Sequence, residues 1–446
     1  MKLVYNVNDK PKFGQMLIFA FQQLLAILAA TIAVPSIIGN GMSQSAALFG
    51  AGAGTIIYLL FTKFRSPVFL GSSFAFIGSM FAAFGGAASA ELGYLGILLG
   101  AVFAGLIYVI IALVVKIAGV NWISKLMPAV VIGPTVAIIG LSLAGNAVGD
   151  VLKYAAYDTA NSAYVMNTHA WVGFICAVVT VLFVIISSVY GKKFTKLIPF
   201  IIGILAGYVV AAIFTLVGMK TGNDALLVID FGIFENMQWY PDFAFLKAFK
   251  GIESITFEYI ATVAVAYIPV AFVVFAEHIA DHKNLSSIIE KDLLKDPGLH
   301  RTLLGDGIGS IVGAFFGGCP NTTYGESVGC VAITKNASVV TILATAIIAI
   351  IASFIAPFVT FLATIPAPVM GGVCITLYGF IAVSGLKMLQ GVDLNNNKNL
   401  FVASVILITG IGGMSLQLGQ VKITTIACAL ILGILVNLLV SKAKDQ

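Results

Sequence analysis

Three carboxylates lie within or at the end of apolar segments of this 446-residue chain: Glu277, Asp281 and Glu326. If these segments cross a membrane, a charge at the centre costs at least about 2.5–3.5 kcal/mol, so such residues usually line a substrate or ion path or relay protons. Asp281 follows Glu277 by four residues, which places both on one face of a helix. Two neighbouring carboxylates in a low dielectric exchange protons near neutral pH, so this pair is a candidate proton-binding site.

A structural role is the alternative for each carboxylate. Glu277 or Glu326 would then pair with a buried lysine, but no lysine lies inside a neighbouring apolar segment. Asp281 lies nearer the end of its segment, so a structural or surface role stays open for it. The histidines in or near the following loop are interpreted as structural residues: His278, His282 and His300.

A flat, neutral heterocycle is the ligand that best matches the side chains expected around these carboxylates. The remaining set comprises Ser72, Ser73, Asn321, Thr322, Thr323, Tyr324 and Tyr378, with Phe74 and Phe76 close by. A carboxylate accepts from a ring N–H, backbone N–H groups at a helix start donate to a ring carbonyl, and an aromatic side chain stacks on the ring. Sugars would require more polar groups, and metal ions more ligands. We therefore predict no metal site and no cofactor.

The composition places these residues in a membrane protein. Hydrophobic residues make up 60% of the chain and charged residues 10%, against about 25% charged in a soluble domain. The mean hydropathy of +1.05 agrees. These values exclude a soluble enzyme, a disordered chain and a nucleic-acid binder. The apolar segments also offer no nucleophile–base pair or metal cluster, so a membrane enzyme is not predicted.

Fourteen apolar segments predict an all-α integral membrane protein with 14 spans. They lie at roughly 13–37, 45–62, 68–84, 93–115, 126–145, 169–190, 197–217, 259–280, 302–316, 322–334, 338–363, 367–386, 399–415 and 423–441. The third segment is broken by Gly-Ser-Ser at 71–73, and the tenth opens with Pro-Asn-Thr-Thr at 320–323. Backbone that is not helical at membrane depth is tolerated only inside protein or along a cavity. These two broken segments are therefore expected at the binding site.

The lysines and arginines predict the orientation of the spans. Five of the 24 fall in loops predicted to lie outside: Lys153, Lys220, Lys247, Lys250 and Lys422. The other 19 fall in inside loops or at the termini, as positive-inside insertion requires. The N- and C-termini are therefore predicted to be cytoplasmic.

An internal repeat relates the two halves of the chain. The pattern Pro-Ala-x-Val-x-Gly at 128–133 recurs at 366–371, where the fifth and twelfth segments begin. The two broken segments are also seven apart. Because seven is odd, the copies face opposite ways across the membrane, which indicates an inverted-topology repeat.

Several motifs resemble those of the nucleobase–cation symporters, also called nucleobase–ascorbate transporters, and within that family the uracil permease branch. They are Ala276-Glu277-His278, KDLLKDPGLHR at 291–301, PNTTYGE at 320–326, GSSFAFI at 71–77 and PVMGGV at 368–373. The resemblance runs over nearly the whole chain.

The resemblance implies two inverted repeats of seven spans, with short antiparallel strands in spans three and ten. It implies a core domain at 1–120 (spans 1–4) and 259–363 (spans 8–11). It implies a gate domain at 121–258 (spans 5–7) and 364–446 (spans 12–14). Members are typically homodimers that meet through their gate domains.

The resemblance also assigns roles to residues. Substrate binding falls on Phe74, Glu277, Tyr324, Gly325, Glu326 and Tyr378. Proton coupling is predicted at Glu277 and Asp281 from the carboxylate pair itself, not from the resemblance. Glutamate at 326 favours uracil, because purine- and ascorbate-type members tend to carry Gln there. Three positions depart from the family pattern. Asp281 stands where some uracil carriers have His, Ser327 stands where the family usually has Asn, and Gln23 stands where some relatives have His.

The function implied is proton-coupled uracil uptake across the plasma membrane by a multi-pass protein embedded in lipid. The alternative is a purine or xanthine permease on the same scaffold, which would need a wider pocket. An anion transporter of the same architecture would need a basic residue at the site, and none is visible in the sequence.

Overall fold

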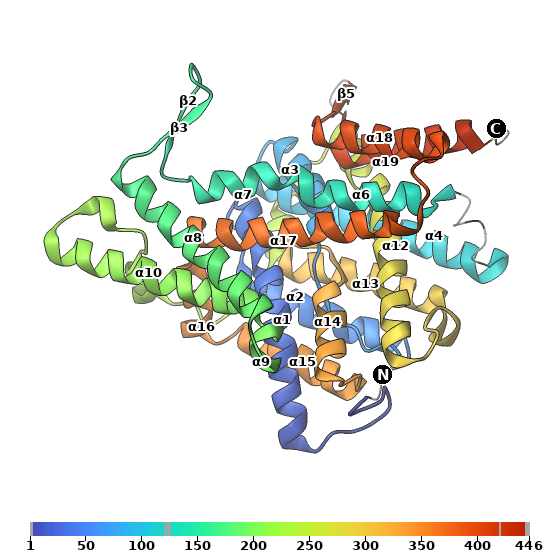
Figure 1. Ribbon diagram of the computed structural model, residues 1–446, viewed down its shortest axis with the longest axis horizontal. Coiled ribbons are helices and arrows are strands. Elements are labelled where there is room, and N and C mark those ends of the chain that lie inside the picture. Colours follow the sequence, from blue (N-terminus) through green and yellow to red (C-terminus); the bar gives the residue numbers. More distant parts are fainter. Residues whose placement is uncertain (1–2, 120–121, 123–125, 419–420, 442–446) are drawn as a thin grey trace. The chain divides into compact units, whose positions relative to one another are not determined.

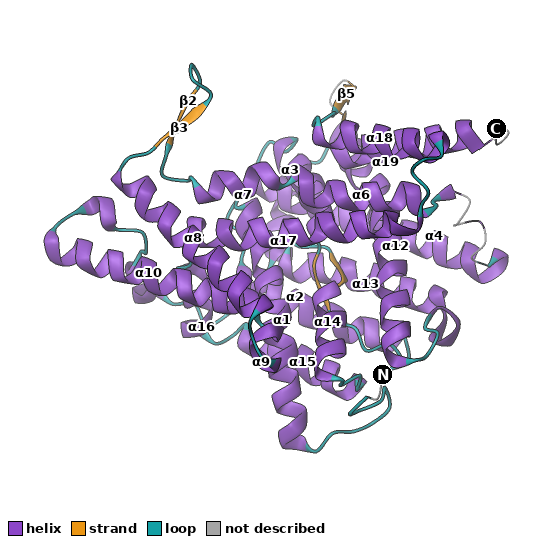
Figure 2. Ribbon diagram, viewed as in Figure 1, coloured by secondary structure: helices purple, strands orange, loops and turns teal. Residues whose placement is uncertain are grey.

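A computed structural model describes residues 3–119, 122, 126–418 and 421–441, and this part of the chain is mostly helical (Figure 1, Figure 2). The α-helices are α1 (Phe13–Ile38), α2 (Gln44–Phe61), α3 (Ile77–Gly85), α4 (Ala90–Ala118), α6 (Ala129–Ser142), α7 (Ala144–Val151), α8 (Thr168–Val189), α9 (Lys193–Leu197), α10 (Pro199–Thr221), α11 (Ala244–Ala248), α12 (Phe257–Ile289), α13 (Leu299–Gly317), α14 (Gly325–Thr334), α15 (Val339–Ala352), α16 (Ala356–Ala363), α17 (Ala367–Lys387), α18 (Asn397–Ile411) and α19 (Thr425–Ser441). Short 3₁₀ helices lie at η1 (Phe74–Phe76), η2 (Asp224–Leu226), η3 (Phe231–Asn236), η4 (Phe249–Ser254) and η6 (Met388–Gly391), and a π-helical turn at η5 (Leu294–Gly298).

The strands of the described residues pair two by two, each pair antiparallel. The pairs are β1 (Leu70–Ser72) with β4 (Asn321–Thr323), β2 (Ala156–Asp158) with β3 (Ala163–Val165), and β5 (Leu416–Leu418) with β6 (Val421–Ile423). The β2–β3 and β5–β6 pairs are local hairpins. The β1–β4 pair instead joins the two broken segments that are distant in the sequence.

The helices have the length and composition of membrane spans. Among the described residues, eight are long and apolar enough to cross a membrane, and α15 with α16 would make a ninth if the pair, bent by 83°, is one span. Helices α8 and α10 expose large apolar side chains such as Ile185 and Ile213. Apolar surface of this extent suits lipid rather than water. The protein is therefore a multi-pass membrane protein.

Each of the fourteen predicted segments coincides with a helix, with a strand followed by a helix, or with the bent pair α15–α16. The segment predicted at 259–280 extends furthest beyond its predicted end: it continues as α12 to Ile289, so Asp281 lies inside a helix rather than near its end. The number of segments that cross the membrane stays a prediction. The orientation does too, and Lys2, Lys125, Lys442 and Lys444, which contributed to it, lie outside the described residues.

Polar residues cap the starts of several long helices. The side chains of Ser43, Ser89 and Thr256 accept backbone N–H bonds in the first turns of α2, α4 and α12, respectively. Such caps satisfy N–H groups that the helix itself leaves without a partner. The helix that carries Glu277 therefore has a defined beginning.

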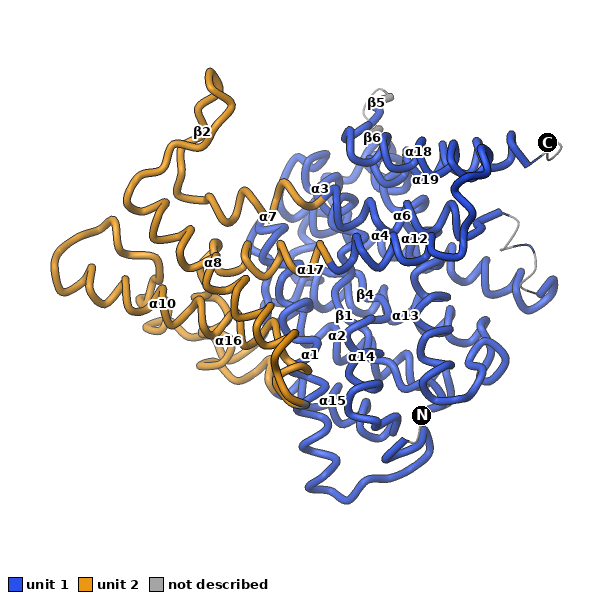
Figure 3. Tube along the Cα trace, in the orientation of Figure 1, with its two compact units in different colours: residues 1–142, 241–351, 380–446 blue, residues 143–240, 352–379 orange. Residues whose placement is uncertain are grey.

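The chain divides into two compact units (Figure 3). Unit 1 comprises Met1–Ser142, Pro241–Ile351 and Phe380–Gln446, and unit 2 comprises Leu143–Tyr240 and Ala352–Gly379. The predicted core and gate domains divide the chain at other positions and stay a prediction.

Small residues let the central helices of unit 1 approach closely. A Cβ added at Gly50 of α2 would lie 2.7 Å from the carbonyl oxygen of Gly313 of α13. Backbones that come this near are typical of helices packed in a membrane. Helix α13 also packs on α4, and α4 on α12. This bundle forms the frame on which the β1–β4 pair is held.

Candidate substrate-binding site

The β1–β4 pair brings the two broken segments together in unit 1. Its register pairs Leu70 with Thr323, Gly71 with Thr322 and Ser72 with Asn321. Backbone hydrogen bonds continue beyond it, from Ser73 N to the Pro320 carbonyl (2.9 Å) and from Tyr324 N to the Phe69 carbonyl (3.3 Å). Each strand leads directly into a short helix, so the starts of η1 and α14 are fixed relative to each other.

Two hydroxyl groups hold the β1 strand in place. Leu70 N donates to Thr55 Oγ1 of α2 at 2.9 Å. Phe69 N donates to Ser327 Oγ of α14 at 3.0 Å, and Gln23 Nε2 of α1 donates to the same oxygen at 2.5 Å. Gln23 and Ser327 are two of the three positions that depart from the family pattern, and they are in direct contact.

Asn321 holds the β4 strand against the helical frame. Its side chain is 1% exposed and donates from Nδ2 to the Gly50 carbonyl at 2.9 Å. Gly313 leaves the space that the amide occupies. Asn321 was counted among the polar groups expected to face a ligand, but it does not line the cavity described below, and its contacts indicate a structural role.

Tyr324 packs on β1. Its hydroxyl donates to the Ser72 carbonyl at 2.7 Å, and its ring lies so close to Gly71 that a Cβ added there would overlap it. The absence of a side chain at Gly71 is therefore a requirement of this packing. Gly325 and Glu326 follow directly, so the position of Tyr324 also sets theirs.

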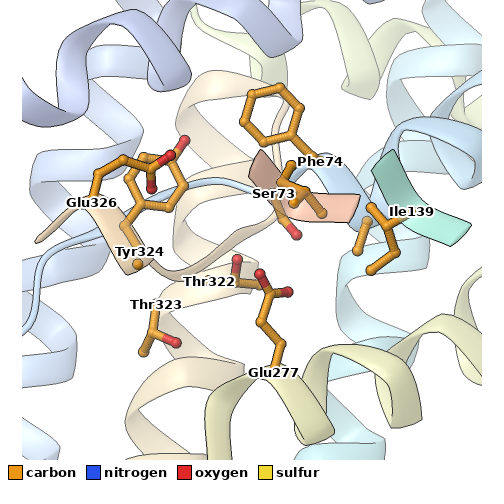
Figure 4. A pocket seen from close by; sticks show the side chains of 11 residues that line it. Ser73, Phe74, Ile139, Glu277, Thr322, Thr323, Tyr324 and Glu326 are labelled. Atoms are coloured by element: carbon orange, nitrogen blue, oxygen red, sulfur yellow. The ribbon is translucent and has the colours of Figure 1, made fainter. Parts of the chain in front are cut away.

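A small cavity lies beside the β1–β4 pair (Figure 4). Its volume is about 40 Å³, which holds roughly three water molecules. It is lined by Ser73, Phe74, Ala75, Ile139, Glu277, Thr322, Thr323, Tyr324, Gly325, Glu326 and Ile381, all of unit 1. Five of the six residues predicted to bind substrate are in this lining. The sixth, Tyr378, belongs to unit 2, and its role stays a prediction.

The predicted carboxylates meet at this cavity. Glu277 enters it from α12 and Glu326 from the first turn of α14 (Figure 4), and both are half-buried. Asp281 does not line the cavity directly. Its carboxylate accepts a 3.0 Å hydrogen bond from Thr323 Oγ1, and Thr323 does line it. Thr323 thus connects Asp281 to the cavity.

Sequence reasoning missed part of the lining. Ile139 of α6 and Ile381 of α17 supply apolar side chains to the cavity. They had no signal in the sequence, because each is one apolar residue among many. Ser73 was in the expected polar set, and its hydroxyl is buried without a hydrogen-bond partner among the described residues.

A further buried carboxylate was also missed. Asp306 lies inside the apolar segment at 302–316 but is not among the carboxylates singled out from the sequence. It is fully buried within α13. His278 Nδ1 lies 2.8 Å from its Oδ2, and His278 Nε2 lies 3.0 Å from Thr302 Oγ1. The sequence did contain a signal for this pair, because His278 and Asp306 each lie inside an apolar segment.

Both ring nitrogens of a second buried histidine, His282, lie within hydrogen-bond distance of a partner. His282 Nδ1 lies 2.8 Å from the His278 carbonyl, and its Nε2 lies 2.7 Å from the Tyr58 hydroxyl. The two imidazole rings stack at 4.0 Å. The structural interpretation of these two histidines agrees with these contacts, although both lie within α12 and not in a loop.

Comparison with known proteins identifies the family. A permease family matches residues 14–419. The chain belongs to this permease family. A uracil permease of Bacillus caldolyticus is 38% identical to this permease over 443 residues, which covers 98% of this chain and 95% of the relative. Uracil permeases of Bacillus subtilis (strain 168) and Escherichia coli (strain K12) are 37% and 34% identical, and cover 100% and 97% of this chain and 97% and 93% of their own lengths. The resemblance to the uracil permease branch is confirmed.

Solved structures show that the fold is that of a transporter. The transmembrane domain of the cyanobacterial bicarbonate transporter BicA superimposes with a TM-score of 0.66 at 17% identity, covering 98% of the permease and 100% of that chain. SLC26A9 superimposes with a TM-score of 0.63 at 10% identity, covering 98% and 67%. The permease is therefore a transporter and not an enzyme.

Proposed function

We propose that this permease carries uracil into the cell together with protons. The observation that carries the proposal is the cavity of unit 1, which combines two carboxylates with the start of helix α14 and two aromatic side chains. The uracil permeases among its relatives support the choice of substrate.

The cavity complements the groups of a pyrimidine ring. The carboxylates of Glu277 and Glu326 accept from ring N–H groups. The first backbone N–H groups of α14 have no partner within the helix and lie at its positive end, so they donate to a ring carbonyl. Ser73 Oγ offers a further hydroxyl donor, and Phe74 packs on the ring.

Proton coupling is proposed from the number of carboxylates at the site. Glu277, Glu326 and Asp281 are joined by the cavity or by Thr323, and no lysine or arginine is among the residues that line it. Moving several uncompensated negative charges through a low dielectric is costly. A proton on the Glu277–Asp281 pair removes one such charge, so its binding accompanies inward transport.

An inverted repeat is supported by two glycine contacts, one in each unit. A Cβ at Gly133 would lie 2.9 Å from the Gly385 carbonyl, and a Cβ at Gly371 would lie 2.9 Å from the Ala147 carbonyl. Gly371 follows Gly133 by 238 residues, and Gly385 follows Ala147 by the same number. The two contacts are therefore equivalent under the repeat. With it we propose fourteen spans in two inverted sevens.

The remaining architecture is proposed with this repeat. A core domain (1–120 and 259–363) carries the substrate against a gate domain (121–258 and 364–446) in an elevator-like motion. Two copies form a homodimer through their gate domains in the lipid of the plasma membrane, with both termini in the cytoplasm.

The test is uptake of labelled uracil by proteoliposomes with an imposed pH gradient. We expect accumulation when the outside is more acidic and loss of accumulation when an ionophore collapses the gradient. Equal uracil uptake with and without the pH gradient would contradict proton coupling. Stronger competition by xanthine or hypoxanthine than by unlabelled uracil would instead favour a purine permease.

Two substitutions separate binding from coupling. Glu326→Gln keeps the size of the side chain and removes its charge, so uracil binding should fall at least about tenfold, as for other lost charge-assisted hydrogen bonds. Asp281→Asn should retain exchange of labelled for unlabelled uracil while accumulation against a gradient is lost. Full uptake by Glu326→Ala would refute the site.

A further inference from the structure

The cavity has a polar side and an apolar side. In Figure 4, Tyr324 and Glu326 lie on one side, Ile139 lies on the opposite side, and Glu277 enters between them. Ile381 of α17 also lines this cavity, as a second aliphatic side chain. Glu326, in the first turn of α14, and the branched side chain of Ile139 therefore lie on opposite sides of the cavity.

A pyrimidine ring has the same division. In uracil the N–H and C=O groups occupy the consecutive positions from N1 to C4, and C5 and C6 form an apolar edge. If the N–H and C=O groups meet the carboxylates and the start of α14, the C5–C6 edge faces the isoleucines. We infer that Ile139 and Ile381 form a wall that sets which substituent the permease accepts at C5. This inference rests on the proposed function.

The polar groups of the site cannot distinguish uracil from a uracil with a substituent at C5. Uracil and 5-methyluracil present the same hydrogen-bond donors and acceptors, and they differ only by one methyl group. Hydrogen bonds from Glu277, Glu326 and the start of α14 therefore serve both bases alike. Discrimination at C5 has to come from shape, and Ile139 and Ile381 are the branched aliphatic side chains in the lining.

The position of the wall is set by close helix packing. A Cβ at Gly133 would lie 2.9 Å from the carbonyl of Gly385, so α6 and α17 touch at the backbone. Ile138 fills the space over Gly410 of α18, and successive residues point about 100° apart on a helix. With Ile138 held against α18, Ile139 points away from it, and it is 1% exposed. The helix backbones that carry Ile139 and Ile381 are thus held in direct contact.

The experiment compares two bases in competition with labelled uracil in proteoliposomes. The quantity measured is the ratio of the half-inhibiting concentrations of 5-methyluracil and unlabelled uracil. One methylene in an apolar pocket changes discrimination by about 10–200-fold. We expect the ratio to be well above one in the wild-type permease and to fall about tenfold or more in Ile139→Ala.

Two further variants and a control complete the series. Ile139→Val, which removes one methyl group and keeps the branched shape, should lower the ratio by a smaller factor, and Ile381→Ala should lower it as well. Leu141→Ala is the matched control, because Leu141 lies on the same helix and is exposed. It should leave the ratio unchanged.

Any of three results would contradict the proposal that Ile139 and Ile381 form this wall. The first is a ratio of half-inhibiting concentrations near one in the wild-type permease. The second is a ratio within twofold of wild type in all three isoleucine variants, and the third is a change in Leu141→Ala equal to that in the isoleucine variants. If Ile139→Ala does not fold, Ile139→Val and Ile381→Ala decide the question. Failure of the proposed function is distinguishable, because the wild-type permease would then take up no labelled uracil.

Discussion

Gly71 offers the sharpest test of how the β1–β4 pair shapes the site. A Cβ at this position would overlap the Tyr324 ring and lie 2.9 Å from its hydroxyl oxygen. Tyr324 is 4% exposed and its hydroxyl donates to the Ser72 carbonyl. In Gly71→Ala the ring must therefore move, and Gly325 and Glu326 must move with it.

The expected cost follows from these contacts. Overpacking a buried position costs about 1–3 kcal/mol, and the lost hydrogen bond adds about 0.5–1.5 kcal/mol. The sum is about 1.5–4.5 kcal/mol. Because about 1.4 kcal/mol is a factor of ten, uracil affinity should fall by about 3- to 40-fold if half of this cost appears in binding. The assays are equilibrium binding of labelled uracil to purified permease and its thermal unfolding.

Two controls make the reasoning refutable. Gly78→Ala, on the neighbouring helix α3, has nothing within 4 Å of the added Cβ and should behave as wild type. In a Tyr324→Ala background the ring is absent, so Gly71→Ala should cost little further stability. Wild-type affinity in Gly71→Ala, or an undiminished loss of stability in the Tyr324→Ala background, would show that this contact does not shape the site.

Three further predictions follow from buried hydrogen bonds. His278→Leu leaves Asp306 buried without its partner and should lower stability by about 3–5 kcal/mol. His278→Leu combined with Asp306→Leu should recover most of this loss in thermal unfolding, and no recovery would contradict the pairing. Thr323→Val removes the bond to Asp281 and should reduce accumulation under a pH gradient more than uracil exchange, whereas an equal fall in both would argue against a link to coupling. Ser327→Ala removes the acceptor of two hydrogen bonds and should lower the unfolding free energy by about 1–3 kcal/mol, which an unchanged melting temperature would disprove.

Local signals explain what could be predicted from the sequence. A charge inside an apolar segment is visible without any knowledge of its neighbours, so Glu277 and Glu326 were found and both line the cavity. Asp306 escaped because it lies only a few residues inside its segment. Its partnership with His278 becomes visible only when α12 and α13 are placed side by side.

The sequence by itself determined the membrane character, the helical segments and the two broken segments, because hydropathy and chain interruptions are properties of consecutive residues. The tertiary structure decided the rest. It paired Leu70 with Thr323, placed Gln23 against Ser327, and brought Ile139 and Ile381 to one cavity. These residues are far apart along the chain and chemically ordinary. Their roles follow from close helix packing, which local patterns do not specify.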